Sequence, residues 1–199
     1  MRLFRYVAWG LVAVVAIAAA VASLAWYTGE LGGENKALSS IGGPFELVDT
    51  DGDRVTEATF SDKPTAMFFG FTFCPDVCPT TLYEAGGWLD ALGDKADDLR
   101  IVFVTVDPER DTPEQMKSYL SSFDPRIVGL TGSRAQVDDI ISKYRVYAKK
   151  VPLEDGDYTM DHSAAVMLFG KDGDFKGTIN YQESQENAVA KLERLVAGS

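Results

Sequence analysis

Two cysteines and one histidine are the residues of this sequence best suited to binding a soft metal ion. Cys74 and Cys78 are the only cysteines, and His162 is the only histidine. Two thiolates and one imidazole form a soft, low-coordinate ligand set that suits Cu(I) and can also hold Cu(II). Structural zinc takes four protein ligands, and no further cysteine or histidine is present to complete such a set. These residue types therefore predict a copper site formed by Cys74, Cys78 and His162.

The two cysteines could instead form a disulfide, but their spacing is unsuited to a structural one. A bridge closed over the three residues between them would remove little conformational entropy from the unfolded chain. His162 considered alone has the simpler interpretation of a surface or turn residue, and the cysteine pair is what favours a ligand role. Met160 could contribute a thioether ligand, although a methionine beside a strand more commonly packs in the core.

The elements around the cysteines place them at the end of a strand. Residues 65–71 form a continuous apolar run, which predicts a central strand covered on both faces. Residues 80–92 have apolar positions at helical spacing, so the cysteines lie where a strand passes into a helix. A helix N-terminus stabilises negative charge, so at least one of the two thiols should have a lowered pKa. His162 precedes a further predicted strand, whose start can lie beside this junction.

The remaining pattern alternates strands and helices along the chain. This order indicates an α/β domain with a mixed central sheet and helices on both faces. A composition that is 46% hydrophobic can supply the core of such a domain. The predicted strands cover residues 45–48, 54–56, 99–106, 127–130, 164–169 and 175–179, and the predicted helices cover residues 113–123, 133–143 and 184–196.

Charged residues follow the predicted strand at residues 99–106 and should reach the same edge of the sheet as the cysteines. Asp107 or Arg110 could hydrogen-bond to the groups that hold the metal ligands, or form part of a docking rim for a partner protein. Asp161, which is adjacent to His162, is a candidate for the same supporting role. The simpler interpretation of these residues is a charged loop that caps the following helix.

The N-terminal segment has the composition of a membrane anchor. Residues 7–27 contain no charged side chain and are long enough to span a hydrocarbon core of about 30 Å. Arg2 and Arg5 precede this segment, which predicts a cytoplasmic N-terminus and an exported domain. Residues 20–22 (AVA) resemble a signal-peptidase site, so cleavage is the alternative, and either outcome exports the domain. The predicted organisation is a cytoplasmic N-terminus at residues 1–6, a transmembrane helix at residues 7–27, a linker at residues 28–40 and a globular domain at residues 41–199.

The negative net charge of the chain disfavours nucleic acids as partners. A formal net charge of −11 at pH 7 would repel the phosphate backbone of a nucleic acid. We therefore expect no nucleic-acid partner, and the simplest role of the acidic surface is to keep the domain soluble.

Three motifs, in their order and spacing, resemble the Sco/SenC family. They are residues 70–79 (GFTFCPDVCP), residues 106–112 (VDPERDT) and residues 161–163 (DHS), and the resemblance extends roughly from Ile41 to Val196. It implies a thioredoxin-like fold and an anchored copper protein that helps to assemble the dinuclear CuA centre of cytochrome c oxidase.

The resemblance also implies particular residues, partners and a location. Cys74, Cys78 and His162 match the family's copper ligands, and Asp107 matches the aspartate of its Asp-Pro-Glu-Arg-Asp motif. The implied partners are the oxidase subunit that bears CuA and an upstream copper donor protein. The implied location is the inner membrane, with a single membrane span and the domain on the periplasmic side.

A thiol–disulfide oxidoreductase that keeps the cysteines of the oxidase subunit reduced is the main alternative, because the same cysteine pair and fold would serve. Two features disfavour it: thioredoxin motifs have two residues between the cysteines, and no proline stands before Ala164, where thioredoxins carry a cis-proline. A peroxidase is a weaker alternative, because the peroxiredoxin Thr-x-x-Cys signature is not evident. Oxidation of Cys74 and Cys78 to a disulfide would remove both thiolates and eject copper, so the redox state could control metal loading.

Overall fold

The chain divides into two compact units, Met1–Leu38 and Ser39–Ser199. The computed structural model describes residues 2–27, 41–154 and 156–198. The linker predicted at residues 28–40 therefore lies outside the described residues.

The described residues of the first unit form the helix α1 (Arg2–Tyr27). Within the described residues, no helix combines the length and the apolar composition required to cross a membrane. The transmembrane helix at residues 7–27 accordingly stays a prediction from the sequence.

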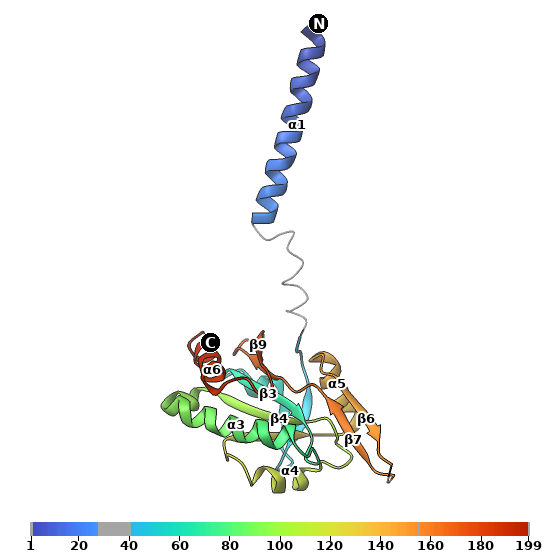
Figure 1. The fold of residues 1–199 in the computed structure, drawn as a ribbon, viewed down its shortest axis with the longest axis vertical. Helices are drawn as coiled ribbons and strands as arrows, with labels where there is room; N and C mark the ends of the chain where they lie inside the picture. Colours follow the sequence, from blue (N-terminus) through green and yellow to red (C-terminus); the bar gives the residue numbers. More distant parts are fainter. Residues whose placement is uncertain (1, 28–40, 155, 199) are drawn as a thin grey trace. The chain divides into compact units, whose positions relative to one another are not determined.

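A seven-stranded mixed sheet forms the centre of the second unit, and Figure 1 labels its strands β3, β4 and β9. The strands lie in the order β2-β1-β5-β4-β3-β8-β9. The three middle strands β5, β4 and β3 are parallel, and every other neighbouring pair is antiparallel. The strands are β1 (Glu46–Asp49), β2 (Arg54–Thr56), β3 (Thr65–Gly70), β4 (Arg100–Thr105), β5 (Ile127–Thr131), β8 (Val166–Phe169) and β9 (Phe175–Ile179).

Helices lie on both faces of this sheet. Phe68 of β3 stacks on Phe103 of β4, and Tyr119 of α4 packs on the same Phe103 ring. Phe69, the next residue of β3, faces the opposite side, because successive side chains of a strand alternate, and it meets Tyr144 at the end of α5. The helices are α3 (Val77–Leu92), α4 (Pro113–Leu120), α5 (Arg134–Lys143) and α6 (Gln185–Ala197), with short 3-10 helices η1 (Glu57–Phe60) and η2 (Gly93–Asp98).

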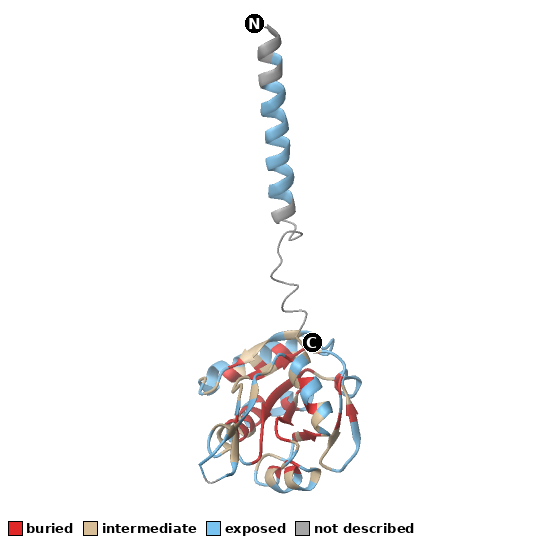
Figure 2. Cartoon of the chain, turned by 90° about the vertical axis from the view of Figure 1, so that its right-hand side faces the viewer, coloured by how far each residue is buried: buried red, intermediate tan, exposed pale blue. Residues whose placement is uncertain are grey.

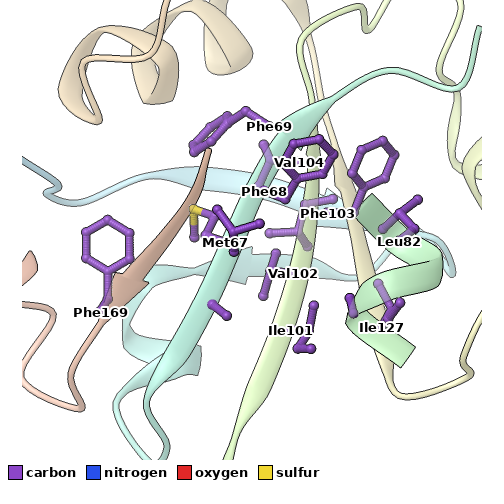
Figure 3. Packing of buried hydrophobic residues seen from close by; sticks show 14 of the residues in the cluster. Met67, Phe68, Phe69, Leu82, Ile101, Val102, Phe103, Val104, Ile127 and Phe169 are labelled. Carbon is purple, nitrogen blue, oxygen red and sulfur yellow. The ribbon is translucent and has the colours of Figure 1, made fainter. Parts of the chain in front are cut away.

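The core of the second unit is built on β3 and β4. All six residues of β3 are buried, as its continuous apolar sequence predicts for a strand covered on both faces. Figure 2 shows the buried residues concentrated on the central strands and the inward sides of the helices. Figure 3 shows side chains of β3 and β4 packed together with Leu82 from α3 and Phe169 from β8. The predicted α/β domain with a mixed central sheet is confirmed.

One hairpin is present that the sequence pattern did not predict. Strands β6 (Ala148–Pro152) and β7 (Tyr158–His162) form a separate two-stranded antiparallel sheet. Lys149 and Lys150 of β6 are exposed. Lysine is uncommon in strands, so the sequence of this segment indicates a loop. His162 is consequently the last residue of a strand and not part of the loop before β8.

Candidate metal centre

The two cysteines lie on either side of the start of α3, directly after the central strand β3. α3 begins at Val77, three residues before the predicted start, so Cys78 is in the first turn of the helix. Asp76, the residue before the helix, makes no side-chain cap. The sulfur of Cys74 accepts a hydrogen bond from the backbone amide of Cys78 instead, at 3.4 Å. The cysteine sulfur therefore satisfies one of the free amides that every helix N-terminus exposes.

Gly70 lets the helix approach the end of β3. A Cβ atom at this position would lie 2.6 Å from Cys78 Sγ and 2.7 Å from the Phe103 ring. Real contacts of this kind do not occur at such distances, so any side chain at residue 70 would displace the sulfur or the ring. The absence of a side chain at Gly70 thus helps to define the position of Cys78, which is fully buried.

His162 reaches the cysteines from the β6–β7 hairpin. Its Nδ1 lies 2.9 Å from the carbonyl oxygen of Ser163. A carbonyl oxygen only accepts hydrogen bonds, so Nδ1 carries a proton, and in the neutral ring Nε2 then has its lone pair free. Nε2 lies 3.5 Å from Cys78 Sγ. The rings of Phe68 and Phe71 contact the imidazole edge-on, with centroids 6.1 and 5.7 Å away, and so limit its orientation.

These contacts bring together the three residues that the sequence singled out. The Sγ atoms of Cys74 and Cys78 and a ring nitrogen of His162 all lie within 4.8 Å of one another. Both cysteines are free, with Cys74 partly exposed and Cys78 buried. The cluster therefore offers three soft donor atoms, one of them on a partly exposed residue, at a spacing that one ion could bridge.

The two thiols differ in acidity because they share one hydrogen bond. The hydrogen bond from the Cys78 side chain is the largest of the effects that together lower the pKa of Cys74 to about 3, and the amides of Cys78 and Asp76 act in the same direction. The same interaction with Cys74, together with burial, raises the pKa of Cys78. The pair therefore holds one thiolate at neutral pH, and that thiolate is the solvent-accessible one.

Asp111 fixes the loop that carries Cys74, and sequence reasoning did not find it. Its buried carboxylate accepts hydrogen bonds from the amide of Thr72 at 3.1 Å, the hydroxyl of Thr72 at 2.7 Å and the hydroxyl of Thr105 at 2.6 Å. Burial raises the pKa of this carboxyl. The only sequence signal was its place in a charged loop after β4, where a buried acid cannot be told from a solvated one.

The residues predicted to support or complete the metal site lie in different environments. Asp107 is buried, and its carboxylate accepts hydrogen bonds from Arg110 Nε at 2.6 Å and from the hydroxyl of Tyr158 at 3.0 Å. Asp161 is exposed and, as the neighbour of His162 in β7, points to the other side of the hairpin. Met160 is buried and, two residues from His162 in β7, lies on the same side of the strand as the imidazole.

Comparisons with known proteins point to one family. A protein-family model described as SCO1/SenC matches residues 33–197. Protein SCO1 homolog 1 of Arabidopsis thaliana, a mitochondrial protein, is 41% identical over 144 residues, which cover 72% of this chain and 43% of the relative. The mitochondrial SCO1 homolog of Homo sapiens is 41% identical over 138 residues, 68% of this chain and 46% of the relative. The chain thus spans less than half the length of these two curated relatives.

Solved structures show the same fold. ScoI from Bradyrhizobium japonicum, solved with copper bound, is 53% identical and gives a TM-score of 0.73 over 78% of this chain and 99% of that one. Yeast Sco1 with copper bound is 37% identical, with a TM-score of 0.74 over 80% of this chain and 90% of that one. These similarities confirm the thioredoxin-like fold that the sequence motifs implied.

Proposed function

Because this chain belongs to the SCO1/SenC family, we propose that it is a copper chaperone rather than an enzyme. It holds copper through Cys74, Cys78 and His162 and delivers the ion during assembly of the CuA centre of cytochrome c oxidase. The observation that carries this proposal is the convergence of three soft donor atoms within 4.8 Å of one another. Thiolate and neutral imidazole are the ligands that copper prefers among protein side chains.

The arrangement of the ligands suits transfer of the ion as well as binding. Cys74 is partly exposed and its lowered pKa keeps it as a thiolate, so it is the sulfur that an incoming ligand or a donor protein can reach. Three ligands leave copper coordinatively open, so an acceptor group can bind before a resident ligand leaves. The proposed partners are an upstream copper donor protein and the oxidase subunit that bears CuA.

The proposal includes attachment to the inner membrane. Residues 7–27 carry no charge, and Arg2 and Arg5 precede them, which supports a single span with the N-terminus in the cytoplasm. The domain at residues 41–199 would then lie on the periplasmic side. A reporter enzyme that is active only outside the cytoplasm, fused after Ser199, should be active, and an inactive fusion would contradict this topology.

Copper stoichiometry of the full-length chain tests the central claim. The reduced protein, loaded anaerobically with Cu(I), should retain one copper ion per chain. His162→Ala and Cys78→Ser should each weaken retention, because each removes one of the three donors. Met160→Leu is the matched control, since it removes a nearby buried sulfur and preserves volume, and it should retain copper as the native chain does. Negligible copper in the native chain would exclude the chaperone function.

A thiol–disulfide oxidoreductase is the second candidate, and the acidity of Cys74 is the observation that favours it. An accessible thiolate beside a protonated thiol is the arrangement that begins disulfide exchange. His162→Ala separates the two functions, because oxidation of the dithiol does not require the imidazole. A chaperone loses copper retention in this variant, whereas an oxidoreductase keeps its activity toward a disulfide of the oxidase subunit.

Oxidation should also control copper loading. A disulfide between Cys74 and Cys78 would convert both thiolates to sulfurs that bind copper poorly. The oxidised chain should therefore release copper, and equal retention by the oxidised and reduced chains would show that the two sulfurs are not ligands.

A further inference from the structure

The hairpin that carries His162 is not part of the central sheet. β6 and β7 pair only with each other in the described sheets, with Ala148 opposite His162 at one end and Pro152 opposite Tyr158 at the other. A two-stranded hairpin alone is marginally stable in water. The position of His162 relative to the cysteines therefore depends on the contacts that attach this hairpin to the rest of the domain.

Arg110 makes several of these contacts, and buried Met160 adds an apolar one to the core. Nη1 of Arg110 donates a hydrogen bond to the carbonyl oxygen of Tyr158 at 3.0 Å, and its guanidinium lies over the Tyr158 ring at 3.8 Å. The same guanidinium lies 4.7 Å from the centroid of Phe73 and 5.9 Å from that of Phe71, both in the loop that carries Cys74. Arg110 thus occupies the junction between the hairpin and the cysteine loop, with only 16% of its side chain exposed.

Asp107 anchors this arginine to the central sheet. Its carboxylate accepts hydrogen bonds from Arg110 Nε at 2.6 Å and from the Tyr158 hydroxyl at 3.0 Å, so it holds both partners of the stack. Its own backbone amide donates to the hydroxyl of Thr105, the last residue of β4, at 2.8 Å. The hairpin is therefore attached to the sheet through a buried ion pair, and a charged pair of this kind has a defined geometry.

We propose that Arg110, held by Asp107, is a positioning residue that clamps Tyr158 and thereby places His162 Nε2 beside the cysteine sulfurs. Tyr158 and His162 stand four residues apart in β7, so both side chains lie on the same side of the strand. The Phe71 ring contacts both the Arg110 guanidinium and the His162 imidazole, so one ring connects Arg110 to His162. The clamp depends on the proposed function, because the position of His162 affects copper binding only if His162 is a copper ligand.

The chemistry of the clamp requires arginine. Nη2 of Arg110 is buried and has no hydrogen-bond partner among the described residues, and the guanidinium lies over the rings of Phe73 and Tyr158. A planar guanidinium can stack on rings while its other nitrogens donate hydrogen bonds, which a lysine ammonium cannot do. Gln or Lys at position 110 would therefore lose the stack even where one hydrogen bond is kept.

The single histidine allows a direct test that needs no metal. Because His162 is the only histidine, selective labelling gives one imidazole signal in the NMR spectrum of the reduced, metal-free, full-length chain. In the native chain this signal should show close contacts to the protons of Phe68 and Phe71. Arg110→Gln should abolish these contacts and move the signal toward its position in the unfolded chain. Tyr158→Phe, which removes only the hydroxyl bonded to Asp107, should weaken the contacts while the fold is kept.

Arg134→Gln is the matched control. Arg134 also approaches Asp107, at 3.8 Å, but its hydrogen bonds go to Val106 and Asp138 and not to the hairpin. Its loss should leave the imidazole signal unchanged. An unchanged signal in both Arg110→Gln and Tyr158→Phe would overturn the clamp, and if Arg110→Gln unfolds, the result for Tyr158→Phe decides.

Copper affinity gives a second readout, which separates this inference from the proposed function. If the clamp acts through His162, Arg110→Gln should weaken copper binding in the native background and cause no further weakening in a His162→Ala background. Additive losses would contradict a positioning role. If the native chain binds no copper, the proposed function fails, and the imidazole signal still decides whether Arg110 positions His162.

Discussion

Cys74 and Cys78 have opposite chemical characters although they are four residues apart. Cys74 is partly exposed and accepts hydrogen bonds, so it is the thiolate, whereas Cys78 is buried and keeps its proton. A nucleophile and a protected partner thus lie on either side of the start of α3. Any reagent that attacks thiolates should distinguish the two.

Alkylation of the reduced, metal-free chain should show this difference. A pKa of about 3 keeps Cys74 ionised above about pH 5, so its reaction rate with iodoacetamide should be nearly constant from about pH 5 to pH 8. An ordinary cysteine, with a pKa near 8.5, would react about ten times faster for each pH unit over this range. Mass spectrometry after timed alkylation gives the rate at each pH.

Cys78→Ala is the control for this measurement. It removes the thiol that donates to Cys74, which is the largest cause of the lowered pKa. The rate at Cys74 in this variant should therefore increase with pH. A tenfold increase per pH unit in the native chain would show that no thiolate is held at neutral pH.

Asp111 should make the stability of the fold depend on pH. Burial raises its pKa above the ordinary value of 3.8. The folded state is thus favoured while the carboxyl is protonated, and this contribution is lost as the pH rises from about 3.8 through the folded-state pKa. Asp111→Asn keeps acceptor and donor atoms for Thr72 and Thr105 but does not titrate. Relative to the native chain, its free energy of unfolding should increase between about pH 3.5 and pH 7.

Urea denaturation at both pH values measures this change, and the exposed Asp97→Asn is the control. Asp111→Ala should instead cost about 1–3 kcal/mol at either pH, because the buried amide of Thr72 loses its acceptor. If the free energies of unfolding of Asp111→Asn and the native chain differ by the same amount at both pH values, the Asp111 carboxyl has the same pKa in the folded and unfolded chain.

The strands and helices of the central domain were largely predictable, and the hairpin was not. β3 and β4 are continuous apolar runs, and the starts of α4 and α5 have capping residues, Thr112 and Ser133, whose side chains accept from the helix amides. Local sequence determines such elements. The β6–β7 hairpin depends on Arg110 and Asp107, which lie far from it in the sequence, so no local pattern identifies it.

The residues of the candidate site were also predictable only in part. Cys74, Cys78 and His162 were identifiable because few side chains have their chemistry, and the structure brings all three together. Asp107 and Arg110 were predicted as possible supporting residues, whereas Asp111 was not, although all three belong to one charged loop. Only the tertiary structure shows that Asp107 and Asp111 are fully buried.

The close approach of α3 to β3 predicts opposite effects for two glycines. Gly70→Ala should destabilise the fold by about 1–3 kcal/mol and weaken copper retention, because the new Cβ would overlap Cys78 Sγ and the Phe103 ring. Gly87→Ala places a Cβ within α3 where no atom lies within 4 Å, and it should stabilise the fold by about 0.5–1 kcal/mol through the better helix propensity of alanine. Urea denaturation of the two variants beside the native chain measures both changes.

A Gly70→Ala chain as stable as the native chain would show that the space beside Cys78 accommodates a Cβ atom, because Gly70 lies in strand β3 and its substitution does not act through helix propensity. Copper retention adds a second distinction, since Gly87 is remote from the sulfurs and its substitution should leave retention unchanged.

Copper should stabilise the molecule as a whole, since its proposed ligands come from both the main sheet domain and the separate hairpin. A ligand that binds only the folded state adds about 2.7 kcal/mol to the free energy of unfolding when its free concentration is about 100 times its Kd. The copper-loaded chain should therefore unfold at a higher urea concentration than the metal-free chain. A Cu(I) chelator should reverse the shift.

His162→Ala should show a smaller shift under the same copper concentration, because its Kd is larger. If copper raised the urea concentration of unfolding equally in the native chain and in Cys78→Ser, it would stabilise the fold through some other site.

The separation of β6–β7 from the central sheet has a kinetic consequence. Segments with few attachments open without global unfolding, so amide hydrogen exchange in β6 and β7 should report a lower free energy of opening than exchange in β3 and β4. Each opening event withdraws the imidazole and leaves both sulfurs in the folded domain. The residence time of a bound ion would then be set by the frequency of a local fluctuation, and a chain that resists denaturation strongly could still exchange its metal rapidly.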